Sequence, residues 1–140
     1  MARYCLDASF LLAWLVPGNA SSTVESRWRS FTGEDDLIAP SLLRAECTSV
    51  LARRVHSRAI DESDGRLQIA RILRLPLSIV DRGPLYLRAF DIARALGWSK
   101  AYDALYIAIA EAEAAELLTL DHGLCGGARR LGVRAALINA

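Results

Sequence analysis

Short runs of apolar residues alternate along this chain with longer segments in which apolar residues recur every three to four positions. The short runs predict strands over Arg3–Leu6, Leu37–Ala39, Leu77–Val80, Leu117–Leu120 and Ala135–Ile138. The longer segments predict helices from Ser9 to Pro17-Gly18, Ala20 to Phe31, Ser41 to Ser57, Asp61 to Leu73, Leu85 to Leu96 and Tyr102 to Ala114, with a short helix after Asp121. Because helices rather than hairpin turns separate the strands, we expect an α/β fold whose central parallel sheet is sandwiched by helices.

Several residues mark the expected ends of these helices. Ser9 and Ser99 carry hydroxyls and are expected to cap the helices that begin nearby. Pro40 suits the first turn of a helix, and Gly97 suits the left-handed residue that ends one. Residues 102–110 are apolar almost all round, which predicts a helix covered on every side.

The composition fits one globular domain over residues 1–140. The chain is 53% hydrophobic, so it can fill a core, and its net charge of +1 neither favours nor excludes a polyanionic partner. Of the 17 basic residues all but Lys100 are arginine. We interpret this bias mainly as a codon preference, although arginine side chains also suit phosphate.

Cysteine content and hydropathy exclude several classes of protein. The cysteines Cys5, Cys47 and Cys125 are odd in number and far apart, so neither a zinc knuckle nor a redox pair is expected. Cys5 and Cys47 lie among apolar residues, and we interpret these two as core thiols. The longest apolar runs are well below the ~18 residues needed to cross a bilayer, and the amino terminus has no apolar signal core. We therefore expect a cytoplasmic protein that makes no use of a membrane.

Four acidic residues lie where a folded core would normally exclude them. Asp7 and Asp121 directly follow two predicted strands, and the carboxyl ends of parallel strands are where open α/β sheets bind ligands. Glu46 lies within the apolar stripe of its predicted helix, where a carboxylate needs a partner. Asp103 lies in the first turn of the most apolar predicted helix.

Each acid alone also has a purely structural interpretation. Asp7 could cap a helix, Asp103 could interact with a helix dipole, Asp121 could belong to a turn, and Glu46 could pair with a neighbouring arginine. Four carboxylates at one edge, however, would repel one another unless a cation lay between them. Oxygen ligands without histidine or cysteine suit a hard cation, Mg²⁺ or Mn²⁺.

Four segments that carry these acids follow one another in a familiar order and spacing. They are Leu6–Ser9, Ala39–Glu46, Tyr102–Tyr106 and Leu118–Asp121. Together they resemble the PIN-domain family and, within it, the VapC-type toxins of bacterial toxin–antitoxin pairs. The resemblance covers the whole chain, and none of the family's acids is missing.

The resemblance implies a metal-dependent endoribonuclease that uses Mg²⁺ or Mn²⁺. Carried over residue by residue, the metal-binding and catalytic acids are Asp7, Glu46, Asp103 and Asp121, and the hydroxyls that hold carboxylates in place are Ser9 and Thr119. The resemblance further implies an RNA substrate, a cognate VapB-type antitoxin and homodimerisation.

Basic and aromatic residues supply candidates for contacts with RNA. The arginines are Arg53, Arg54, Arg58, Arg129, Arg130 and Arg134, which could form a phosphate-binding rim or simply solvated helix faces. Trp14, Trp28 and Trp98 could stack on bases, or could pack in the core or an interface. His122 is expected to be a turn residue and His56 a surface residue.

Two alternative functions remain open from the sequence. A phosphatase of haloacid-dehalogenase type would also begin with an aspartate after the first strand, but it would need a second aspartate where this chain has Ser9. A non-catalytic PIN-like domain that only binds RNA or a partner would be expected to lack at least one acid.

Overall fold

The computed structural model describes residues 1–15 and 22–139, and its centre is a five-stranded sheet in which all strands are parallel. The strands are β1 (Arg3–Leu6), β2 (Asp36–Ala39), β3 (Leu77–Ile79), β4 (Glu116–Thr119) and β5 (Ala135–Leu137). Their order in the sheet is β3-β2-β1-β4-β5, so β1 lies in the middle. The predicted α/β class with a parallel sheet is confirmed.

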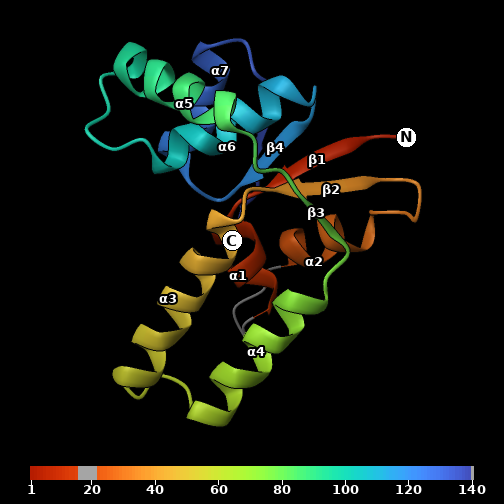
Figure 1. Ribbon diagram of the computed structural model, residues 1–140. Helices are drawn as coiled ribbons and strands as arrows, with labels where there is room; N and C mark the ends of the chain where they lie inside the picture. The colour runs from red at the N-terminus through yellow and green to blue at the C-terminus, as the bar shows by residue number, and fades with distance from the viewer. Residues whose placement is uncertain (16–21, 140) are drawn as a thin grey trace.

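Helices cover both faces of this sheet. The helices are α1 (Ala8–Leu15), α2 (Ser22–Arg29), α3 (Leu42–His56), α4 (Glu62–Arg74), α5 (Gly83–Leu96), α6 (Tyr102–Ala112) and α7 (His122–Arg130). Figure 1 shows α5, α6 and α7 on one face and α1 to α4 on the other, with α3 and α4 projecting away from the sheet. Among the described residues, no helix is long and apolar enough to cross a membrane.

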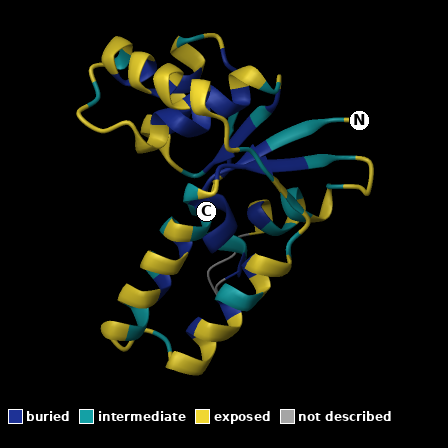
Figure 2. Cartoon of the chain, viewed as in Figure 1, coloured by how far each residue is buried: buried dark blue, intermediate teal, exposed yellow. Residues whose placement is uncertain are grey.

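Burial is concentrated on the sheet and on α6. Residues 104–110 of α6 are all buried, as expected for a helix enclosed between the sheet and its neighbours. The same region is dark in Figure 2, whereas α3 and α4 carry long exposed stripes. On the other face, α1 packs its buried side chains against β2, α3 and α4. Cys5 and Cys47 are buried free thiols, as predicted, and so is Cys125.

Some predicted helix ends are wrong. Asp7, not Ser9, caps α1, because its carboxylate accepts the Phe10 N–H at 3.0 Å and Ser9 is already helical. Ser99 does not cap α6, whose N-cap is Ala101. Pro40 precedes α3 and its N-cap instead of lying in the first turn. Gly97 does end α5 in the left-handed region, with φ 71°.

Two further corrections concern the segments around β4. Helix α6 ends at Ala112 rather than at Ala114, because Ala114 itself adopts a left-handed conformation with φ 51°. His122 is the first residue of α7 rather than a turn residue. The predicted end of the first helix at Pro17-Gly18 and the start of the second at Ala20 lie outside the described residues.

Candidate active site

The candidate site lies at the topological switch point of the sheet. There the chain stops adding strands on one side of β1 and starts adding them on the other. Strands β1 and β4 are neighbours with Leu6 opposite Leu118, and the chain leaves both at the same edge. Asp7 directly follows β1, and Asp121 follows β4 two residues after its end. Such an edge in an open α/β sheet leaves room for a ligand between the first turns of the helices that follow.

Asp7 is held by hydroxyl and backbone donors. The Ser9 hydroxyl donates to both carboxylate oxygens at 2.7 and 2.9 Å, the Thr119 hydroxyl donates to Oδ2, and the Phe10 N–H donates to Oδ1. Asp7 is only 5% exposed and Thr119 is fully buried. These donors fix the carboxylate and stabilise its ionised form.

Glu46 is held by a tyrosine rather than by an arginine. The buried Tyr106 of α6 donates its hydroxyl hydrogen to Glu46 Oε1 at 2.6 Å. Among the described residues Glu46 forms no ion pair, so its interpretation as the partner of a neighbouring arginine is wrong. The partly buried Glu46 carboxylate is therefore stabilised by a neutral hydrogen-bond donor, which does not cancel its negative charge.

Asp121 and Asp103 belong to the first turns of two helices. Asp121 is the N-cap of α7, and its Oδ1 accepts the Leu124 N–H at 3.0 Å, so it is a cap rather than a turn residue. Asp103 lies in the first turn of α6 and is exposed. Both positions bring a carboxylate to the positive end of a helix dipole.

The four carboxylates interact electrostatically. Burial raises the pKa of Asp7, and the charge of Asp121 raises it further, against the lowering effect of its hydrogen bonds. Burial also raises the pKa of Glu46, to which Asp103 and Asp7 add. Burial and the charge of Asp121 raise the pKa of Asp103. Each carboxyl with a raised pKa therefore lies near at least one of the other acids, and the cluster as a whole favours a cation.

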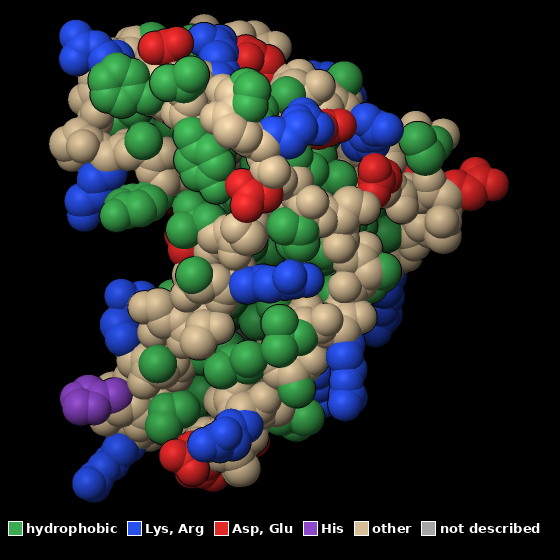
Figure 3. All heavy atoms as spheres, viewed as in Figure 1, with side chains coloured by type: hydrophobic (Ala, Val, Ile, Leu, Met, Phe, Trp, Pro, Cys, Tyr) green, Lys and Arg blue, Asp and Glu red, His purple; other side chains and the backbone are tan. Residues whose placement is uncertain are grey.

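Three of the four acids line one open cleft of ≈ 550 Å³. Glu46, Asp103 and Asp121 line it together with Trp98 and Lys100, whereas Asp7 lies outside the lining. Among the described residues that line this cleft, Lys100 has the basic side chain. In Figure 3 the surface is indented between the part that carries α5 and α6 and the projecting α3–α4 pair.

The chemistry of these donors fits a hard divalent cation. All four offer carboxylate oxygens, and at least one oxygen of Glu46, of Asp103 and of Asp121 accepts no hydrogen bond from the described residues. Within residues 1–15 and 22–139, no three His, Cys, Asp or Glu side chains are arranged closely enough to ligate one ion together. The arrangement therefore fits Mg²⁺ held by one or two carboxylates and completed by water.

The predicted arginines lie at a distance from the carboxylates along their helices. Arg53 and Arg54 are in the last turn of α3, and Arg58 follows it, so they lie about 10 Å or more beyond Glu46 along the helix axis. Arg129 and Arg130 end the helix that Asp121 begins. The Arg129 guanidinium donates to the Ala135 carbonyl.

The predicted stacking residues differ in their surroundings. Trp14 and Trp28 stack on each other with ring centroids 3.9 Å apart, within a cluster that includes Phe10 and Phe31. Only Trp98 lines the acidic cleft. Its ring packs so closely on Gly127 that a Cβ there would lie 2.6 Å from a ring carbon.

Sequence reasoning did not single out Tyr106 or Lys100 as site residues. Tyr106 lies three residues after Asp103, within the buried segment 104–110 of α6, and a buried tyrosine hydroxyl needs a polar partner. This requirement indicates that Tyr106 has a polar partner, although it does not identify that partner as Glu46. Nothing in the sequence marks Lys100 as a site residue except that it is the only lysine in the chain.

Comparison with known proteins identifies the class of this fold and site. The model of the PIN domain family matches residues 4–129, so the chain belongs to the PIN domain family. Comparison with curated protein sequences gives no significant match.

Solved structures share the fold at low sequence identity. VapBC2 from Rickettsia felis, bound to a DNA fragment from its promoter, is similar with TM-score 0.72 and 14% identity, covering 98% of this chain and 99% of that one. VapC20 from Mycobacterium tuberculosis, a toxin that cleaves the sarcin-ricin loop, gives 0.70 and 17%, covering 88% and 93%. PAE2754 from Pyrobaculum aerophilum gives 0.70 and 21%, covering 90% and 84%. The predicted resemblance to VapC-type proteins thus holds at the level of the fold.

Proposed function

We propose that this protein is a metal-dependent endoribonuclease that acts as the toxin of a toxin–antitoxin pair. The observation that carries the proposal is a group of four acids: Asp7 and Asp121 follow β1 and β4, and Glu46 and Asp103 come from α3 and α6. Among the described residues, no basic side chain forms an ion pair with these acids, so no ion pair offsets their mutual repulsion. A PIN domain with this donor set is suited to Mg²⁺ or Mn²⁺.

The reaction would be hydrolysis of an RNA phosphodiester, in which water adds to phosphorus and the bond to the adjoining nucleoside oxygen breaks. One or two of the cleft carboxylates, Glu46, Asp103 and Asp121, would bind the cation directly, and the remaining acids, with the buried Asp7, would act on it through bound water. A bound divalent cation supplies positive charge next to the phosphate and makes water a better nucleophile. Ser9, Thr119 and Tyr106 would keep the carboxylates oriented.

The family match and the site together favour this function over the alternatives. A PIN domain is a different family from the haloacid-dehalogenase phosphatases, and Ser9 donates to Asp7 where a phosphatase would need a second aspartate. All four acids are retained, which disfavours a non-catalytic binding domain.

An antitoxin partner is part of the proposal. Complexes such as VapBC2 from R. felis and VapBC-1 from nontypeable Haemophilus influenzae share this fold. An arginine from a VapB-type antitoxin placed in the acidic cleft would neutralise the carboxylates and exclude both the cation and RNA. Homodimerisation and a cytoplasmic location complete the proposal, as in the VapC-type toxins that the chain resembles.

Metal dependence is the first test. The purified protein should cleave single-stranded RNA with Mg²⁺ or Mn²⁺ and stop when EDTA is added. Activity should return when Mg²⁺ is restored in excess. Undiminished cleavage in EDTA would refute the metal-dependent mechanism.

A substitution at Asp7 tests the site itself. Asp7→Asn keeps the shape of the side chain and removes its charge, so the fold should survive while cleavage and growth arrest are lost. The matched control is Asp64→Asn, which changes an exposed acid in the first turn of α4. Growth arrest by Asp7→Asn equal to that of the wild type would remove Asp7 from the site.

Co-expression tests the antitoxin. The product of the small gene beside this one should co-purify with the protein and block cleavage of RNA. If that product neither binds nor protects RNA, the toxin assignment loses its support, whereas the nuclease assignment stands on the cleavage assay alone.

A further inference from the structure

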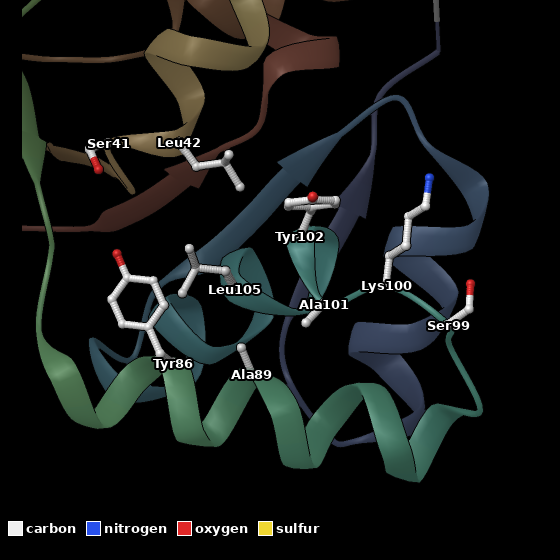
Figure 4. A pocket seen from close by; sticks show the side chains of 9 residues that line it. All are labelled: Ser41, Leu42, Tyr86, Ala89, Ser99, Lys100, Ala101, Tyr102 and Leu105. Atoms are coloured by element: carbon white, nitrogen blue, oxygen red, sulfur yellow. The ribbon is translucent and has the colours of Figure 1, made fainter.

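A second groove, of ≈ 600 Å³, lies beside the acidic cleft and has a different character. It is formed by the start of α3, by α5 and by the start of α6, and its lining includes Leu42, Tyr86, Ala89, Lys100, Tyr102 and Leu105. Figure 4 shows the two tyrosine rings on either side of Leu42 and Leu105, with Ala89 and Ala101 beside them. The carboxylates of the proposed site do not line it.

The groove and the acidic cleft are continuous. Ser99, Lys100 and Tyr102 line both of them, and Tyr102 directly precedes Asp103 in α6. A strand whose phosphate lies among the carboxylates would therefore have a neighbouring nucleotide within reach of the groove. Lys100 lies at the junction, where its charge attracts a phosphate.

The tyrosine rings leave their faces available. Tyr86 is 52% exposed and Tyr102 is 62% exposed, although both lie against apolar side chains. The Tyr86 hydroxyl donates to Asp81 at 2.8 Å, which restrains the ring at the groove. Exposed aromatic rings suit the flat faces of bases, which stack on aromatic side chains irrespective of sequence.

We propose that this groove binds an unpaired base of the RNA strand, next to the phosphate that is cleaved. The inference rests on the proposed function, because it assigns the groove to the same substrate. Tyr102 stacks on the base from the side of the acidic cleft, Tyr86 packs at the far side, and Lys100 contacts the intervening phosphate. The groove would thus make the protein select single-stranded or looped RNA, because a paired base cannot enter it.

The rival occupant is a second copy of the chain. Leu87 and Phe90 of α5 are also exposed, at 73% and 58%, but neither lines the groove. A second copy that covered this helix would bury Phe90 together with the groove, whereas a base in the groove would leave Phe90 in water. Phe90→Ala is therefore the matched control for loss of an exposed aromatic ring on the same face.

The test measures cleavage of a short single-stranded oligoribonucleotide with Mg²⁺. Tyr102→Ala should raise KM about ten-fold, the usual effect of losing one base–aromatic stack, with little change in kcat. Tyr86→Ala removes the ring at the far side of the groove and should also raise KM, whereas Phe90→Ala removes an exposed ring outside the groove and should behave like the wild type. Because these side chains are exposed, the variants should fold, and their circular dichroism should match that of the wild type.

A substrate with an abasic nucleotide beside the cleavage site tests the base directly. The wild type should lose about ten-fold in affinity for it, whereas Tyr102→Ala should lose nothing further, since both changes remove the same stack. Equal losses in both proteins would overturn the proposal. So would an unchanged KM for Tyr102→Ala, or a loss in Phe90→Ala accompanied by dissociation of a dimer in sedimentation.

Failure of this inference is distinguishable from failure of the proposed function. Wild-type cleavage with unaffected tyrosine variants refutes the groove and leaves the nuclease intact. If the wild type cleaves no RNA, the proposed function fails, and fluorescence anisotropy of the same oligoribonucleotide with the same variants still decides whether the groove binds a base.

Discussion

Tyr106→Phe is expected to destabilise the protein although it removes a single oxygen atom. The hydroxyl donates at 2.6 Å to the Glu46 carboxylate, and Tyr106 itself is only 1% exposed, so water cannot replace it from the tyrosine side. A hydrogen bond to a charged group contributes about 1.5–3 kcal/mol. For a chain of this length, that loss corresponds to a melting temperature roughly 5–10 °C lower at neutral pH.

The size of this loss should depend on pH. The Tyr106 hydrogen bond lowers the pKa of Glu46, against the raising effects of burial and of Asp103 and Asp7. Without this hydrogen bond the pKa of Glu46 rises further, so Tyr106→Phe should lose most stability at a pH where Glu46 is ionised. Below the pKa of Glu46 its carboxyl is protonated in both proteins, and the hydrogen bond is then a neutral one worth only about 1 kcal/mol.

Thermal melts of metal-free protein followed by circular dichroism, at several pH values, measure both effects. The control is Tyr4→Phe, since the hydroxyl of Tyr4 makes no hydrogen bond with the described residues. Its melting temperature should change little at any pH. Melting temperatures that fall equally for the two variants, or a loss in Tyr106→Phe that is constant from mild acid to neutral pH, would refute the reasoning.

Three further predictions concern stability. Removing a repelling charge by Asp103→Asn in metal-free protein should leave the melting temperature equal or higher, while a clear drop would favour a role of Asp103 at the helix dipole. Because the pKa values of Asp7, Glu46 and Asp103 are raised in the folded state, metal-free protein should lose stability as the pH rises from mild acid through those values, and melts with Mg²⁺ should show a smaller loss. Gly126→Ala, which meets no atom within 4 Å, should stabilise α7 by about 0.5–1 kcal/mol. Gly127→Ala should destabilise by about 1–3 kcal/mol through its contact with Trp98, and equal melting temperatures for the two glycine variants would contradict this account.

The sequence predicts the sheet and the positions of the acids because both depend on local patterns. Short apolar runs bounded by polar residues mark β1 and β4, and an aspartate follows each of them. Parallel strands then bring Asp7 and Asp121 to one edge whatever the details of packing. The enclosed helix α6 is predicted for the same reason, since its apolar positions continue all round the helix.

Local competition between similar residues is not predictable in this way. Asp7 and Ser9 are both good capping residues two positions apart. Asp7 caps the helix, which begins at Ala8, and its carboxylate is also held by Thr119 of a strand distant in sequence. Ala114 adopts a left-handed conformation, which the sequence does not indicate because the residue is not a glycine. The contact between Tyr106 and Glu46 depends on how α6 and α3 pack, which neither helix reveals alone.

The partners of Asp7 also determine when during synthesis the site can exist. Asp7 and Thr119 are 112 residues apart in sequence, yet β1 needs β4 beside it for the carboxylate to be held. At typical translation rates of about 5–20 residues per second, roughly 6–20 s separate the synthesis of these two residues. During that interval β1, β2, β3 and Asp103 have been made, while β4 is incomplete and Asp121 is still missing. The proposed nuclease site therefore cannot assemble on the ribosome until almost all of the domain has been translated.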